Sequence, residues 1–112
     1  MTEDIMDKHY ARLVELSQVK GDYTANKQVF LDAMYIVGLC YIHNVKIKEI
    51  SMGNNVLRII FDSVYFYFWN SLEYIKYWDT VPEDYVLMFK REELKDVFLN
   101  TFLPMPKNKK IG

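Results

Sequence analysis

The chain has 112 residues, of which 51% are hydrophobic and 26% are charged. This length and composition predict one globular domain with a hydrophobic core, and they argue against two ordinary domains or a disordered chain. The formal net charge of -1 gives no overall positive field, so nucleic-acid binding would need a local basic patch.

The single cysteine, Cys40, excludes an internal disulfide and therefore a disulfide-stabilised secreted domain. Acidic residues precede the first apolar run, unlike the basic start of a secretory signal. The longest apolar stretch, residues 29 to 42, contains Asp32 and is shorter than the roughly 20 residues that a membrane-spanning helix needs. We therefore expect a cytoplasmic protein with no membrane segment.

Two helices are predicted in the N-terminal part of the chain. The first begins at the N-cap Thr2 and repeats apolar residues at helical spacing until Gly21, which favours a helix end. The second follows the N-cap Thr24 and extends to His43. Few of its positions after Val29 are polar, which indicates a central helix.

A β-hairpin is predicted next. Residues 45 to 50 largely alternate between apolar and polar, and after a turn-rich segment residues 56 to 61 form an apolar, β-branched run. If the register allows, Lys46, Lys48 and Arg58 project from one face of this hairpin.

Residues 63 to 78 have two interpretations. Helical spacing places Val64, Phe68 and Leu72 on one side and polar residues on the other, which favours an aromatic-rich helix. The aromatic content instead favours strands, which would form a second hairpin around Asn70. Because the two-sided segregation extends over the whole segment, the helix is the preferred interpretation.

The rest of the chain predicts a short buried strand over residues 85 to 89 and an amphipathic helix that begins near Lys90. Pro104 and the proline that follows it favour the end of that helix. We expect a single compact domain over residues 1–103 and a flexible basic tail over residues 104–112.

The predicted fold class is therefore α+β. It comprises two N-terminal helices, a β-hairpin, an aromatic-rich helix or second hairpin, a short strand and a C-terminal helix, arranged around one small antiparallel sheet.

No metal-binding or nucleophilic motif is evident. Cys40 and His43 are three residues apart and could supply two metal ligands, but a structural zinc site needs four and the only other histidine is His9. A helical cysteine among apolar neighbours is better explained as a buried thiol, whose thiolate is disfavoured.

The acidic residues also lack a catalytic spacing. The nearest approximation to a metal-dependent nuclease site is Asp62 with Glu73 and Lys76, and no motif brings these residues together. The glycines do not cluster into a phosphate-binding loop. We therefore expect no enzyme activity, no metal and no cofactor.

Large aromatic side chains are concentrated between Tyr65 and Trp78, with eight rings in fourteen positions. One core face rarely needs so many rings, so we predict that some are exposed and bind another protein. The predicted protein-binding residues are Tyr67, Trp69, Tyr74, Tyr77 and Trp78.

These observations predict a non-enzymatic factor that binds a host protein, or a second copy of this chain, and acts by steric occlusion. Residues with AT-rich codons are abundant, including 9 Tyr, 7 Phe and 6 Met, which suggests a phage or viral accessory protein. The alternative is a small nucleic-acid-binding protein that uses Lys46, Lys48 and Arg58 together with stacking rings.

Overall fold

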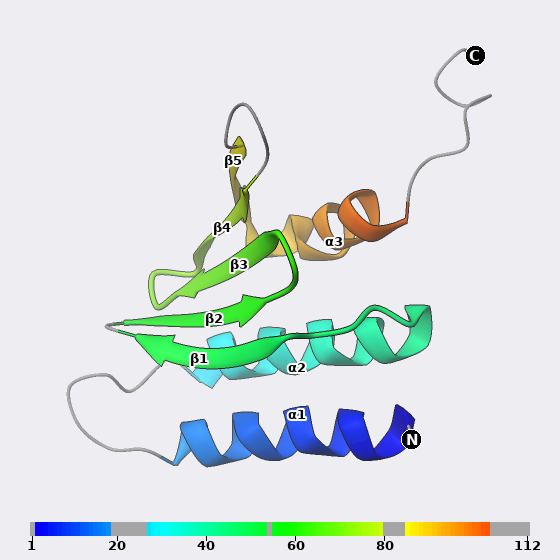
Figure 1. Cartoon of the computed structure of the whole chain (residues 1–112). Helices are drawn as coiled ribbons and strands as arrows, with labels where there is room; N and C mark the ends of the chain where they lie inside the picture. The colour runs from blue at the N-terminus through cyan, green and yellow to red at the C-terminus, as the bar shows by residue number, and fades with distance from the viewer. Residues whose placement is uncertain (1, 19–26, 54, 80–84, 104–112) are drawn as a thin grey trace.

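Apolar residues at helical spacing form two N-terminal helices that lie side by side in the computed structural model of the chain (Figure 1). They are α1 (Thr2–Ser17) and α2 (Lys27–His43). The structure describes residues 2–18, 27–53, 55–79 and 85–103. The predicted helix stop, second N-cap and basic tail lie outside these residues; they are Gly21, Thr24 and residues 104–112.

The end of α2 has a local cause. Asn44 adopts a left-handed conformation with φ of 59°, and the Val45 amide donates a hydrogen bond of 2.9 Å to the Cys40 carbonyl. Asn tolerates this conformation better than most residues, so it ends the helix at His43.

The middle of the chain forms a five-stranded antiparallel sheet in which each strand pairs with its neighbours in sequence. Its strands, in spatial order, are β1 (Glu49–Gly53), β2 (Val56–Ile60), β3 (Val64–Trp69), β4 (Glu73–Trp78) and β5 (Tyr85–Lys90). Asn55 and Leu72 have positive φ of 63° and 70°, and each lies in a tight turn between two strands.

A short 3-10 helix, η1 (Arg91–Glu93), follows β5 and leads into α3 (Leu94–Phe102). The Lys90 backbone amide donates a hydrogen bond of 2.9 Å to Glu93 Oε1. This contact satisfies one of the amides that the start of a helix leaves without a partner.

The core lies between the helices and one face of the sheet. α2 supplies eight buried residues, which confirms that it is central, and α3 supplies three. The ring of Phe66 lies 5.7 Å from that of Phe61, 6.1 Å from that of Phe89 and 6.3 Å from that of Phe102. Strands and α3 are therefore joined by one aromatic cluster.

The α+β class and the first hairpin are confirmed, but the aromatic-rich helix is wrong. Residues 63 to 78 contain the β3–β4 hairpin instead, which was the other interpretation. β3 pairs with β2 and β4 pairs with β5, so both strands have hydrogen-bonded neighbours on each side, and the aromatic residues favour this extended conformation.

Two smaller expectations also need correction. The first strand begins at Glu49, so residues 45 to 48 form the connection before it. The strand at residues 85 to 90 exists, but of its six residues only Phe89 is buried. It is the last strand in the sheet, so its outer side has no neighbouring strand among the described residues.

Among the residues that the structure describes, no helix is long and apolar enough to cross a bilayer.

Candidate functional site

Alternation along β3 sends its side chains to two opposite faces of the sheet. Phe66 and Phe68 are buried, whereas Tyr65 and Tyr67 are half-buried. Because Phe66 packs against Phe102 of α3, the buried side is the one that the helices cover. The tyrosines therefore point to the other side.

We call this other side the open face. The strand register gives it a continuous set of mostly apolar side chains that extends from β2 to β5. Its central members are Val56, Arg58, Ile60, Tyr65, Tyr67, Trp69, Ile75, Tyr77, Val86 and Met88. Charged residues lie on the same face at its margins, Glu49 on β1 and Glu73 and Lys90 on β4 and β5. The ring of Tyr65 lies 6.4 Å from that of Tyr67 and 5.6 Å from that of Tyr77, so rings contact one another across this face.

Arg58 is the charged residue among the central members of the open face. Its Nε donates a hydrogen bond of 3.2 Å to Ser51 Oγ on the neighbouring strand. At one margin, Glu73 and Lys90 stand opposite each other in the β4–β5 pair. Apolar exposure is high on β5, where Met88 is 66% exposed. An apolar central area with charged residues at its margins is typical of a protein interface.

The structure separates the predicted protein-binding residues. Tyr67, Trp69 and Tyr77 lie on the open face and are half-buried. Tyr74 is fully buried on the helix-covered face, so the expectation that it is exposed is wrong. Trp78 is 38% exposed but belongs to that same covered side. The prediction assumed helical spacing, and strand alternation divides odd from even positions instead.

Sequence reasoning missed the aliphatic half of the open face. Ile75, Val86 and Met88 complete its rows. Alternation within the strand at residues 85 to 90 places Val86 and Met88 together. Which strand lies next to it is tertiary information, so their alignment with the tyrosines does not follow from local pattern alone.

Lys76 is buried on the helix-covered side of β4. Its Nζ lies 4.9 Å from the centre of the Trp78 ring and 5.4 Å from that of Tyr85, and burial lowers its pKa. Asp62 and Glu73 lie at opposite ends of the β3–β4 hairpin and are both exposed. The three residues considered for a nuclease site therefore do not converge.

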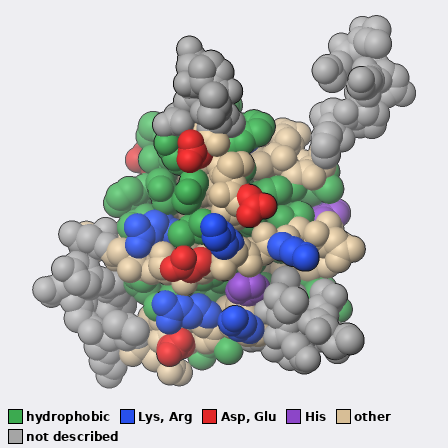
Figure 2. All heavy atoms as spheres, viewed as in Figure 1, with side chains coloured by type: hydrophobic (Ala, Val, Ile, Leu, Met, Phe, Trp, Pro, Cys, Tyr) green, Lys and Arg blue, Asp and Glu red, His purple; other side chains and the backbone are tan. Residues whose placement is uncertain are grey.

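The basic residues of the nucleic-acid alternative do not share one face. Lys46 and Lys48 are exposed in the connection before β1, whereas Arg58 lies on the open face beside Tyr67. Figure 2 shows Lys and Arg side chains over α1 and the nearest strands, with Asp and Glu side chains among them. The mixture gives no continuous positive surface in that view.

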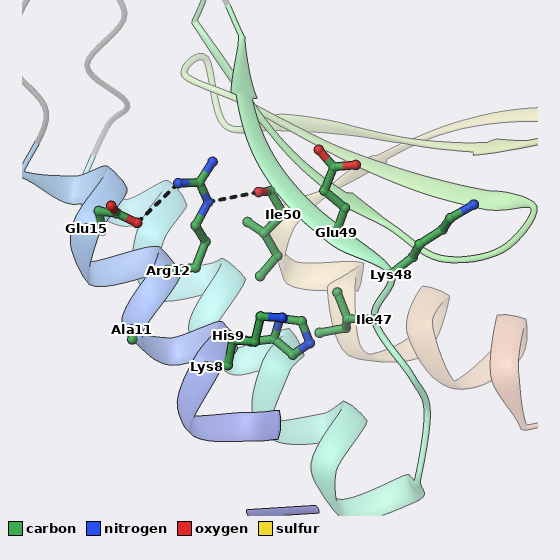
Figure 3. Close-up of a pocket in the computed structure, with 9 residues that line it drawn as sticks. All are labelled: Lys8, His9, Ala11, Arg12, Glu15, Ile47, Lys48, Glu49 and Ile50. Carbon is green, nitrogen blue, oxygen red and sulfur yellow. Dashed lines mark hydrogen bonds and ion pairs between the residues drawn. The ribbon is translucent and has the colours of Figure 1, made fainter. Parts of the chain in front are cut away.

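A groove of about 790 Å³ separates α1 from β1 and the connection before it (Figure 3). Its lining residues are Lys8, His9, Ala11, Arg12, Glu15, Ile47, Lys48, Glu49 and Ile50. Arg12 bridges it, since Nε donates to the Ile50 carbonyl at 3.2 Å and Nη1 to Glu15 Oε1 at 3.1 Å. Burial, and then the charge of Lys8, lower the pKa of His9.

Cys40 has no reactive environment. The side chain is fully buried in α2, and burial raises the pKa of the thiol to about 12. The predicted buried thiol is therefore confirmed. Within the described ranges, no group of three His, Cys, Asp or Glu side chains could hold a metal ion.

The strongest polar cluster surrounds Asp32 in α2. Arg91 donates two hydrogen bonds to its carboxylate, from Nε at 2.9 Å and from Nη2 at 2.8 Å, and the Tyr74 hydroxyl and Gln28 Nε2 each donate another. Burial raises the pKa of Asp32, but these hydrogen bonds outweigh it and hold the pKa below its ordinary value. With its acceptors occupied in this way, the carboxylate joins α2, β4 and η1 as a structural element.

Comparisons of this chain with protein-family models, with curated proteins and with solved structures found no match. The functional argument therefore depends on the surface itself.

Proposed function

We propose that the protein is a binding module that docks another protein on the open face and hinders access to the surface it covers. The observation that supports this proposal is the extent of apolar and aromatic side chains on the side of the sheet away from α3. Tyr and Trp give large contact area at small entropic cost, and flat sheet faces present them in rows.

The charge distribution favours a protein partner over a nucleic acid. Among the described residues, the open face carries two cations. Arg58 Nε already bonds Ser51, and Lys90 stands opposite Glu73 at the margin. Binding to phosphates draws most of its affinity from several cationic contacts. The partner that this face fits is therefore an apolar protein surface with few charges.

A photo-crosslinking experiment tests the proposal. A benzophenone amino acid replaces Tyr67 on the open face or, as a matched control, Tyr35 on α2, which is 45% exposed. We expect a protein from the source cell to crosslink at position 67 only. The purified partner should then bind wild-type protein and Tyr35→Ala equally, and Tyr67→Ala at least tenfold more weakly.

Equal binding by the two alanine variants, with folding intact, would contradict the proposal. Fluorescence anisotropy with a labelled single-stranded oligonucleotide at low salt tests the alternative. Affinity that falls steeply as salt rises, and that is lost in Arg58→Ala, would favour nucleic-acid binding instead.

A further inference from the structure

The two edge strands of the sheet differ in what lies beside them. β1 lies beside α1, and Arg12 Nε donates a hydrogen bond to the outward Ile50 carbonyl. β5, at the other end, pairs with β4 alone among the described residues. Natural proteins usually protect such an edge with charge, proline or a covering segment. From Tyr85 to Phe89, β5 has neither charge nor proline.

Backbone alternation identifies which groups β5 presents at this edge. In an antiparallel pair, successive residues point their N–H and C=O groups alternately toward one neighbour and the other. The Lys90 amide bonds Glu93 Oε1 rather than β4. Because the direction alternates, the backbone N–H and C=O groups of Val86 and Met88 also point away from β4. A second bond gives the same result. The Asp79 amide bonds the Ser63 carbonyl, so Ile75 and Tyr77 point their backbone groups toward β3 and the residues between them point toward β5. The β5 residues opposite those are Tyr85, Leu87 and Phe89, which leaves the backbone groups of Val86 and Met88 pointing outward.

Both outward residues are also exposed. Val86 is 57% exposed and Met88 is 66% exposed. Each therefore offers an N–H, a C=O and an apolar side chain at the end of the sheet. An extended backbone can pair with all of these groups together.

We propose that this extended backbone is β5 of a second copy of the chain, which joins two sheets edge to edge in an antiparallel dimer. A two-fold axis at Leu87 sets Val86 of each copy opposite Met88 of the other. All four outward N–H and C=O groups of each strand then form hydrogen bonds across the axis. Val86 also packs against the partner's Met88, which is a favourable apolar cross-strand pair.

Self-pairing about Met88 satisfies fewer groups. An axis at Met88 would set Val86 opposite Lys90, whose amide already bonds Glu93. The axis at Leu87 instead pairs Val86 with Met88, whose outward amides have no bond of this kind among the described residues. The formal net charge of -1 opposes association of two copies only weakly.

This inference goes beyond the proposed function and does not depend on it. The edge contacts are backbone hydrogen bonds, whereas the proposed docking uses tyrosine side chains on the open face. Dimerisation would place two open faces side by side and double the docking area, which raises avidity for a repetitive partner.

Solution mass and a backbone variant give the first test. Light scattering should show twice 13.4 kDa at high micromolar concentration. Val86→Pro removes one outward amide without affecting a β4–β5 hydrogen bond, and we expect at least a tenfold increase in the dimer dissociation constant. Val86→Ala is the matched control, because it keeps the amide, and it should weaken the dimer much less. Circular dichroism checks that both variants fold.

A disulfide test reports the register even if the proline variant fails to fold. Leu87 would face the partner's Leu87 with Cα atoms about 4.5 Å apart, which suits a disulfide. Leu87→Cys should therefore form a covalent dimer on mild oxidation, while Cys40 stays buried. Met88→Cys is the control, since its two Cα atoms would lie about 8 Å apart, too far to bridge.

A monomer at all accessible concentrations would overturn the proposal. Equal crosslinking of Leu87→Cys and Met88→Cys would overturn the register. Slow hydrogen exchange at the Val86 and Met88 amides of a monomer would also overturn the proposal, because another segment of the same chain would then cover the edge. Loss of partner binding in Tyr67→Ala with the dimer intact separates the two proposals.

Discussion

The hydroxyl of Tyr74 in β4 donates a hydrogen bond to the carboxylate of Asp32 in α2, across 42 positions of sequence. Both side chains are buried, so this contact connects helix and sheet inside the core. The same carboxylate also binds Arg91, next to α3. One acidic group therefore fixes α2 against two later parts of the chain.

Removing that hydroxyl should destabilise the fold. Tyr74→Phe keeps the ring in the aromatic cluster but deletes a hydrogen bond to a charged group, which should lower the free energy of unfolding by about 2 kcal/mol. Tyr35→Phe deletes a hydroxyl from a side chain that is 45% exposed, and should change it little. Urea denaturation of both variants and wild type checks this, and equal midpoints would contradict it.

Asp32 should also make stability sensitive to acid. Burial opposes the charged form, but hydrogen bonds from Arg91, Tyr74 and Gln28 outweigh it, so its folded-state pKa is below the unfolded value. The resulting stabilisation is complete above that unfolded value, about pH 4, and is lost as the pH falls through the folded-state pKa.

The measurement compares urea midpoints of wild type and Asp32→Asn between pH 7 and pH 3. We expect a large difference at neutral pH that narrows below about pH 4. Asp62→Asn, at an exposed turn, should follow wild type throughout. A difference between wild type and Asp32→Asn that stays constant with pH would contradict the role assigned to the carboxylate.

Truncation of two neighbouring residues in β3 should destabilise the fold to very different extents. Phe68 is fully buried against Tyr74, with ring centres 4.8 Å apart, and Phe68→Ala should lower the free energy of unfolding by about 4 kcal/mol. Tyr67 lies on the open face, so Tyr67→Ala should lower it by about 1 kcal/mol. Thermal unfolding distinguishes them, and similar losses would show that both rings belong to the core.

Cys40 should react with a thiol reagent only when the protein unfolds. The thiol is fully buried, so the reagent cannot reach it in the folded state. Burial also raises its pKa to about 12, so little of the reactive thiolate forms. Ile42→Cys is the control, because residue 42 is 69% exposed on the same helix and its thiol should react at once. Rapid modification of wild-type Cys40 under native conditions would contradict the buried placement.

The sequence predicted the elements whose local signals agree. The helical spacing of apolar residues predicts α1, and the turn-rich segment before Val56 predicts the first hairpin. The helix prediction for residues 63 to 78 is wrong because their apolar residues fit both helical and strand spacing. Pairing of β3 with β2 and of β4 with β5 favours strands, and a local sequence pattern does not reveal this pairing.

The candidate site was predictable only in part. Tyr67, Trp69 and Tyr77 were placed in a binding surface from their number and type, and they do share a face. The prediction for Tyr74 is wrong because strand alternation places it opposite Phe68 on the helix-covered face, where its hydroxyl bonds Asp32. An acidic residue within the apolar run of α2 does signal a buried partner, but not which partner it has.

The order of strands has a consequence for the path of folding. Each hairpin of the meander joins segments that are close in sequence, so little loop-closure entropy opposes their formation. The contacts of Asp32 with Tyr74 and Arg91 close far longer loops, of 42 and 59 positions. Docking of α2 onto a preformed meander is therefore the step expected to set the folding rate.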